Sequence, residues 1–404
     1  MKKLLAILFA LLGMGAAGCM PLMKANMAFY NGDYQAAIPT FRERLAQQPD
    51  DWTIRQRLGY ALLKTGEPRS AAEEFKQAIA QAPTMVPLSY LYLGSAQLEL
   101  GDPVAALASL RSFDDKKMTV VKEEVDRLIT LIELEASRTL AKQALAQEAK
   151  LATAAVKADS YAVLNFGLPG PDENLRALQK ALTAMTISDL AQVKTITVVE
   201  RARLQALLDE MNLGQTGAVN AAGAPKVGRL LGADNLVVGN LLAPSGQLGV
   251  ASSTASCTRG QVVGSFSASV SKDKFFELQK QVVAGILKVN NIKVEADTEN
   301  ALLRQYHTKS LQAATYYGQG LDAMDRGDWQ VSKDFFVLAA KEDPNFGLAK
   351  TARDKSPAGL AKGFAGPFGS LAVATVEAAV DAQQSADGLT VGRSNTGGGG
   401  GGGG

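Results

Sequence analysis

Histidine and cysteine, which commonly act as general bases, nucleophiles or metal ligands, are scarce in this sequence. Its 404 residues include one histidine, His307, and two cysteines, Cys19 and Cys257. These cannot build a disulfide framework or a zinc site of several Cys and His ligands. No P-loop, Gly-x-Ser-x-Gly or His-Glu-x-x-His pattern occurs. We therefore predict a protein that is not an enzyme, with no catalytic residue, no metal site and no cofactor.

The remaining reactive side chains have simple structural interpretations. A lone histidine is more often a surface or capping residue than a catalytic one, and no second histidine can assist His307. Cys257 is interpreted as a small buried apolar residue on a strand. The net charge is +2, from 42 Lys and Arg against 40 Asp and Glu. So balanced a charge provides no field for holding phosphate backbones, so nucleic acid is not expected as a partner.

The N-terminus has the pattern of an export signal. Lys2 and Lys3 precede an apolar run over residues 4–12, and small residues lead into Cys19. This arrangement resembles a bacterial lipobox, with Ala16 where the box usually has Leu. The resemblance implies cleavage before Cys19, lipidation of Cys19 and, because Met20 follows, sorting to the outer membrane. The alternative is an ordinary cleaved signal peptide with an incidental cysteine.

A period of 34 residues runs through residues 24–113. Gly32 and Gly66 are 34 residues apart, Gly66 and Gly101 are 35 apart, and "LGYALLKTG" aligns with "LGSAQLELG". Period and residue types resemble tetratricopeptide repeats, in which pairs of helices stack into a superhelix. Glycines would end the first helix of each pair, and alanines such as Ala71 would let the second helix approach closely.

The repeat family presents a concave groove built from its first helices. That phase places seven residues in a predicted partner-binding groove: Gln56, Tyr60, Leu63, Lys64, Ser95, Leu98 and Glu99. The groove is expected either to bind a peptide or to serve as a spacer or an oligomer contact. Its mixed polarity does not select a ligand.

Residues 119–157 contain neither Gly nor Pro, and their apolar residues recur at helical spacing. This favours one long helix or two packed helices that cap the repeats and connect them to the next domain. From Ser160 the composition changes. A β-α-β-α order is followed by three β-like runs and the closing helical stretch "KDKFFELQKQVVAGILKVNNI". This order predicts a mixed sheet with helices packed on it.

Four stretches of this central region carry a resemblance to a known family: "VLNF", "TVVERARLQALLDEMNLGQTG", "GRLLGADNLVVGNL" and "FFELQKQVVAGIL". They resemble the CsgG-like domains of the curli-secretion lipoprotein family, over about residues 160–293. The most specific piece is the strand "TVVE" running into a helix, marked by Glu200, Arg201 and Leu204. Their expected role is structural, because a carboxylate at Glu200 favours the helix N-terminus.

One feature departs from the channel-forming members of this family, which insert long amphipathic hairpins into the domain. Here residues 243–247 and 258–261 are predicted to be short turns. No pair of adjacent runs of about ten residues alternates as a membrane hairpin requires. The resemblance therefore implies the scaffold of the domain without its pore elements.

The C-terminal third becomes helical again. Gly320, Gly327 and Pro344 repeat the spacings of the N-terminal region, which predicts one more repeat-like hairpin. A single hairpin cannot stack alone, so it must pack on the α/β domain or on a partner. From Asp354 onward Gly, Ala and Ser dominate, which predicts a disordered tail. One stretch, "GFAGPFGSLAVATVEAAVDAQ", has the composition of a transient helix or a docking segment.

The predicted fold class is α+β multidomain, with N-terminal tetratricopeptide repeats, a central mixed-sheet CsgG-like domain, a C-terminal helical hairpin and a disordered tail. The predicted segments are 1–18 (signal peptide), 19–118 (repeats), 119–158 (connecting helix or helices), 159–294 (CsgG-like domain), 295–353 (hairpin) and 354–404 (tail).

The function expected from these segments is that of an outer-membrane-anchored periplasmic lipoprotein acting as a protein-interaction scaffold or regulator in envelope assembly or secretion. Its partners would be proteins bound by the groove and the α/β domain, and the membrane through the lipid alone. A homo-oligomer is a further option. The alternative function is a component of a CsgG-type oligomeric secretion channel.

Overall fold

The computed structural model describes residues 20–152, 154–168, 170, 173–212, 223–244, 246–360 and 368–386. The predicted signal peptide, Cys19 and the terminal glycine run lie outside these residues. The chain divides into two compact units, one of Met1–Leu128 with Phe364–Gly404 and one of Ile129–Gly363. It passes from the first unit to the second within helix α7 and returns to the first before helix α17.

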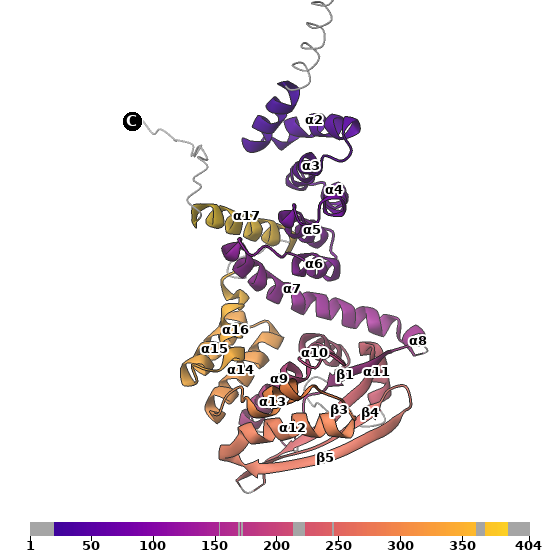
Figure 1. Ribbon diagram of the computed structural model, residues 1–404, viewed down its shortest axis with the longest axis vertical. Helices are drawn as coiled ribbons and strands as arrows, with labels where there is room; N and C mark the ends of the chain where they lie inside the picture. The colour runs from indigo at the N-terminus through magenta and orange to yellow at the C-terminus, as the bar shows by residue number, and fades with distance from the viewer. Residues whose placement is uncertain are drawn as a thin grey trace, which may run out of the picture. The chain divides into compact units, whose positions relative to one another are not determined.

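The first unit contains the predicted helical repeats (Figure 1). A helix over residues 20–30 contacts α2 through the rings of Phe29 and Phe41, whose centroids are 5.9 Å apart, and two further helix pairs follow. The labelled helices are α2 (Tyr34–Gln47), α3 (Trp52–Lys64), α4 (Pro68–Gln81), α5 (Pro87–Glu99) and α6 (Pro103–Arg111).

Local chemistry explains each turn and each close helix crossing of these repeats. Gly32, Gly66 and Gly101 end the first helices with φ near +80° (82°, 81° and 76°), a conformation that other residues adopt at a cost. Within the pairs, a Cβ added to Gly59 would lie 2.9 Å from the Phe75 ring, and one added to Gly94 would lie 2.8 Å from Leu110. The small residues predicted from the repeat pattern therefore set how closely the helices pack.

The connecting segment forms a long helix followed by a short one. Helix α7 runs over Thr119–Ala146, and α8 occupies Glu148–Leu151 after a break at Gln147. This agrees with the expected helical connector, although the second helix is a single turn.

The second unit is built on a mixed sheet. Among the described residues five strands form one sheet in the order β2-β1-β3-β4-β5. β1 pairs in parallel with both β2 and β3, whereas β3-β4 and β4-β5 are antiparallel. The strands are β1 (Lys157–Val163), β2 (Thr197–Val198), β3 (Ala233–Leu242), β4 (Gln247–Ser256) and β5 (Gln261–Ser271).

Helices cover both faces of this sheet. On one face Val163, Val237 and Val250 pack against α9 (Glu173–Leu190) and α12 (Phe275–Val289). On the other face Ala162 and Leu236 pack against α10 (Arg201–Glu210) and α11 (Ala224–Leu231). Because successive strand residues point to opposite faces, the two apolar layers alternate along β1 and β3. The predicted strand over "KTITVVE" is shorter than expected, because only Thr197 and Val198 pair with β1 and Glu200 already stands at the N-cap position of α10.

Four helices complete the second unit: α13 (Ala296–Arg304), α14 (Leu311–Arg326), α15 (Trp329–Glu342) and α16 (Gly347–Asp354). α14 and α15 form the predicted hairpin, and α14 packs on α9. The crossing is close, because a Cβ at Gly318 would lie 1.7 Å from the carbonyl oxygen of Ala177. The hairpin therefore packs on the α/β domain, one of the two surfaces that the sequence allowed.

The tail differs in part from its predicted disorder. Phe368–Ala386 is a helix, α17, and it packs against α5 in the first unit (Figure 1). Low complexity does not prevent folding here, because the repeats supply the apolar surface that the tail could not bury alone. Residues 361–367 and 387–404 lie outside the described part of the chain.

Candidate functional site

Helix α17 lies against the predicted partner-binding groove. Its contact face consists of small and medium apolar side chains with one amide and one hydroxyl. The members of this face that are at most 8% exposed are Leu371, Ala372, Val373, Thr375, Val376, Ala379 and Gln383. A face of small residues lets the backbone of α17 approach the repeats closely, which explains its packing against α5.

One carboxylate of α17 meets two of the predicted groove residues. Tyr60 donates a hydrogen bond of 2.6 Å to Glu377 Oε1. Lys64 Nζ lies 2.9 Å from Oε1 and 3.3 Å from Oε2 of the same side chain. Tyr60 and Lys64 are one turn apart on α3, so their polar ends reach a single point on the docked helix.

The environment of Tyr60 keeps its hydroxyl protonated. Burial is the largest cause that raises its pKa above the ordinary tyrosine value, followed by the hydrogen bond to Glu377 and the nearby charges. The ring is held among other aromatic rings, with centroids 5.7 Å from Phe29, 5.6 Å from Tyr34 and 4.9 Å from Tyr92. Tyr60 is therefore a rigid hydrogen-bond donor aimed at an acceptor on the docked helix.

A second polar contact holds the other end of α17. The backbone N–H of Val120, in the first turn of α7, donates a hydrogen bond of 2.9 Å to Gln383 Oε1. The first N–H groups of a helix have no partner within the helix. Gln383 supplies one here and is itself 5% exposed.

Three of the predicted groove residues are buried within the repeats. They are Leu63, Leu98 and Ser95. The Ser95 hydroxyl donates a hydrogen bond to the carbonyl of Leu91 in its own helix. Ser95 therefore satisfies its own backbone instead of offering a hydroxyl to a ligand.

The last two predicted groove residues lie closer to solvent. Gln56 is partly exposed one turn before Tyr60. The pKa of Glu99 is raised by burial, an effect that the charge of Lys64 partly offsets. The structure thus brings Tyr60, Lys64 and Glu99 together at one part of the groove.

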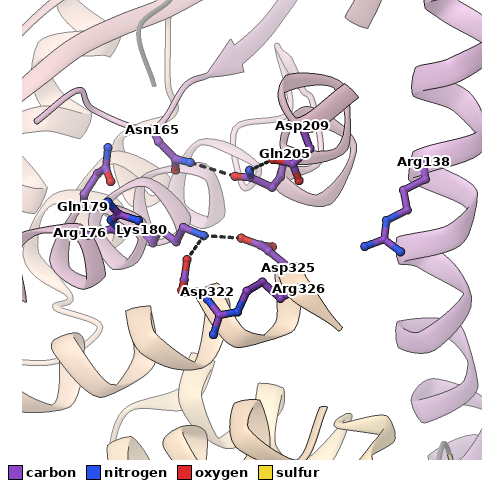
Figure 2. A pocket seen from close by; sticks show the side chains of 10 residues that line it. All are labelled: Arg138, Asn165, Arg176, Gln179, Lys180, Gln205, Asp209, Asp322, Asp325 and Arg326. Atoms are coloured by element: carbon purple, nitrogen blue, oxygen red, sulfur yellow. Dashed lines mark hydrogen bonds and ion pairs between the residues drawn. The ribbon is translucent and has the colours of Figure 1, made fainter. Parts of the chain in front are cut away.

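The second unit contains a polar cavity of about 420 Å³. Figure 2 shows its lining, which comes from α7, α9, α10, α14 and the segment after β1. All of the lining residues are charged or carry an amide: Arg138, Asn165, Arg176, Gln179, Lys180, Gln205, Asp209, Asp322, Asp325 and Arg326.

The charges in this cavity mostly pair with one another. Lys180 lies between two carboxylates, 2.5 Å from Asp322 and 2.9 Å from Asp325 (Figure 2). Arg201 completes the cluster, 2.7 Å from Asp325. The Lys180, Asp325 and Arg201 side chains are only 8–12% exposed. Because these residues come from α9, α14 and α10, the cluster ties the C-terminal hairpin to the α/β domain.

The residues that marked the resemblance in the sequence have distinct positions. Glu200 is the residue before the first turn of α10, Arg201 forms the ion pair with Asp325, and Leu204 is buried in the core below α10. The spacing along the chain indicated the strand-to-helix junction. It did not indicate the partner of Arg201, which lies 124 positions away.

His307 differs from its interpretation as a surface or capping residue. It lies in the segment between α13 and α14, 16% exposed, with Nε2 2.9 Å from Asp189 Oδ1. Lys280 and Gln279 donate to the other oxygen, at 2.7 and 2.8 Å. Burial alone would raise the pKa of Asp189, but the His307, Lys280 and Gln279 contacts hold it below its ordinary value.

Cys257 is fully buried just after the end of β4, and burial raises the pKa of its thiol to about 11. Within the described part of the chain, no group of His, Cys, Asp and Glu residues is placed to hold a metal ion. Over the same residues, no helix is both long and apolar enough to cross a bilayer. The lipidation site predicted at Cys19 lies outside this part.

Comparisons with known proteins agree with two parts of this architecture. No curated protein sequence matches the chain. Among solved structures, the crystal structure of yeast Tom70 matches with 15% identity, 92% coverage of this chain, 69% coverage of that chain and a TM-score of 0.25, which supports no conclusion. The tetratricopeptide repeat family model matches residues 22–86 and 57–118. The model described as curli production assembly/transport component CsgG matches residues 134–274, from within α7 to the residue before α12. Residues 22–118 are therefore similar to tetratricopeptide repeats, and residues 134–274 are similar to the CsgG family.

Proposed function

We propose that this chain is an outer-membrane lipoprotein that faces the periplasm and binds other proteins through its repeat groove, as a scaffold or regulator of envelope assembly or secretion. The observation that carries the proposal is the occupied groove, where α3 and α5 hold a helix through Tyr60, Lys64 and an apolar surface. A groove that binds one helix has the shape and chemistry to bind another.

The CsgG domain supports a role related to secretion, although a shared domain is a weaker argument for function than a site. The membrane anchor rests on the lipobox-like sequence ending at Cys19. The helix that follows exposes Met20, Met23 and Met27, each more than half exposed, at a spacing that places them near one face. An apolar face next to a lipid chain suits contact with the bilayer surface.

Fractionation of cells tests the anchor. The wild-type chain should sediment with outer membranes, and Cys19→Ser should move it to the soluble fraction, because one lipidated residue supplies the attachment. Met20→Asp is the companion variant, expected to change the membrane in which the protein is found. A Cys19→Ser chain that stays in outer membranes contradicts the lipid anchor.

Photo-crosslinking in intact envelopes tests the scaffold role. A photoreactive amino acid at Gln56, partly exposed beside the groove, should form adducts with other proteins. The matched position is Lys76 on α4, whose side chain is 53% exposed and pairs with its neighbour Glu73. Equal adducts at both positions, or none at Gln56, contradict protein binding by the groove.

The second candidate function is a component of a CsgG-type secretion channel, which the match over residues 134–274 favours. The measurement that separates the two is the oligomeric mass of the lipidated protein after gentle extraction. A closed ring of many copies supports the channel component. A monomer or small oligomer supports the scaffold.

A further inference from the structure

The helix that occupies the groove belongs to the same chain. Helix α17 begins at Phe368, and the last described residue before the intervening segment is Leu360. A ligand in the same chain as its binding site competes intramolecularly, and effective concentrations for such ligands reach the millimolar range. An untethered competitor therefore binds more weakly to the occupied groove than it would to an empty one.

Helix α17 depends on the groove for its packing. Between Phe368 and Ala386 six Ala favour a helix, whereas Gly, Ser, Thr and three Val favour it less. Most of the stability of a helix in a protein comes from packing of its apolar face rather than from propensity. Undocking therefore removes the packing that stabilises α17.

The polar contacts of α17 leave two groove side chains ready for another acceptor when it undocks. The Tyr60 hydroxyl then has a hydrogen bond to donate, and the Lys64 amino group no longer contacts Glu377. Lys64 is 31% exposed and Glu377 is 23% exposed, so water reaches the pair. A partly exposed pair of this kind separates at a lower cost than a buried one.

We propose that α17 is a built-in, displaceable ligand of the repeat groove, and that the external partner is a helix of the same chemistry. That helix has an apolar face of small residues and a carboxylate placed to meet Tyr60 and Lys64. This inference rests on the proposed function, since it names the partner class and the regulation of the same groove. The groove binds its partner strongly only when α17 is displaced.

The test uses the full-length chain and a fluorescent peptide of residues 368–386, with binding followed by anisotropy. The wild-type chain should bind the peptide weakly, because its own α17 competes. Glu377→Lys in the chain should strengthen binding of the wild-type peptide by at least about fivefold, since it weakens docking of α17 without altering the groove. Ala382→Lys, which places the same lysine at an exposed position of α17, is the matched control and should leave binding unchanged.

A charge reversal tests the carboxylate itself. The Lys64→Glu chain should prefer a peptide carrying Glu377→Lys over the wild-type peptide, and the preference should reverse for the Glu377→Lys chain. Thermal melts of each variant establish that it is folded. The isosteric Glu377→Gln chain serves in place of Glu377→Lys if that variant does not fold.

Three outcomes overturn the inference. Equal peptide binding by the wild-type and Glu377→Lys chains shows that α17 does not compete. Lack of binding by every folded chain shows that the groove does not accept this helix in trans. A wild-type dimer that is lost in the Glu377→Lys chain assigns α17 to the groove of a second copy.

The inference and the proposed function can fail separately. If the peptide behaves as expected but Gln56 forms no adducts in envelopes, the competing helix stands and the scaffold role does not. If Gln56 forms the same adducts in wild-type and Glu377→Lys cells, the scaffold role stands and the regulation by α17 does not.

Discussion

The repeat groove and the polar cavity both join the C-terminal part of the chain to an earlier part, but with opposite chemistry. In the groove, the contact is an apolar face with one partly exposed ion pair between Lys64 and Glu377. In the cavity, Asp325 and its cations Lys180 and Arg201 are at most 12% exposed. Exposed ion pairs contribute about 0–1 kcal/mol, whereas removal of one partner of a buried pair costs about 3–5 kcal/mol. We therefore expect the contact between α17 and the groove to dissociate readily and the ion pairs around Asp325 to persist.

The largest effect on stability is expected from breaking the buried ion pairs of Asp325. Asp325→Asn leaves Arg201 buried without its carboxylate and leaves Lys180 with Asp322 alone. We expect the second unit to lose about 3 kcal/mol of unfolding free energy, measured by urea denaturation. Asp328→Asn is the control, because its ion pair with Arg326 is more than half exposed and should change stability by less than about 1 kcal/mol. Equal losses of unfolding free energy in both variants would show that burial does not decide how much an ion pair contributes.

A comparable effect is expected at Asp189, whose ion pair with Lys280 is also buried. Asp189→Asn should cost about 3 kcal/mol at neutral pH, because Lys280 loses its carboxylate and the hydrogen bonds from His307 and Gln279 lose their charge assistance. The pKa of Asp189 is lower in the folded chain than in the unfolded chain. Its contribution is therefore fully present above about pH 4 and is lost as pH falls through the folded value.

Urea denaturation at neutral pH and below about pH 4 measures this dependence. The wild-type chain should lose more stability on acidification than Asp189→Asn does. If the two chains show the same pH dependence, titration of Asp189 does not contribute.

A smaller effect is expected for the contact between α17 and the repeat groove. Glu377→Gln removes the charge but keeps the shape, and should weaken docking of α17 by about 1 kcal/mol. Amide hydrogen exchange over residues 371–383 should then be roughly five times faster, with the second unit unchanged. Ala382→Gln, which adds the same amide on the exposed side of α17, is the matched control. A loss of protection spread over both units would show that α17 is not an independent contact.

The smallest effect is expected for Tyr60→Phe, about 0.5 kcal/mol, since the aromatic contacts remain and Lys64 still pairs with Glu377. A double-mutant cycle with Glu377→Gln measures the coupling of the two residues. A coupling energy of zero would show that the hydroxyl does not recognise the carboxylate.

Features that depend on near neighbours in the chain were predictable. The glycines at Gly32, Gly66 and Gly101 mark turns because each must adopt positive φ, which is a property of the residue itself. The central strands followed from runs of β-branched and apolar residues. The length of β2 did not, because the pairing of two strands decides where a strand ends.

The groove residues of the candidate site were predictable, but their partner on α17 was not. The repeat phase indicated Tyr60 and Lys64, but their partner Glu377 lies 313 positions from Lys64, in a segment whose composition indicated disorder. Asp189 and His307, 118 positions apart, escaped prediction for the same reason. A side chain's type does not reveal which distant group will be brought to it.

The sequence by itself determined the helical repeats, the order of strands and helices in the α/β domain and the groove face of α3, because these depend on spacing and on local backbone preferences. The tertiary structure alone decided that α17 folds, that Glu377 meets Tyr60 and Lys64, and that Arg201 pairs with Asp325. The physical reason is that burial and charge pairing are properties of two surfaces together. The sequence of one surface therefore does not predict which distant segment will pack against it.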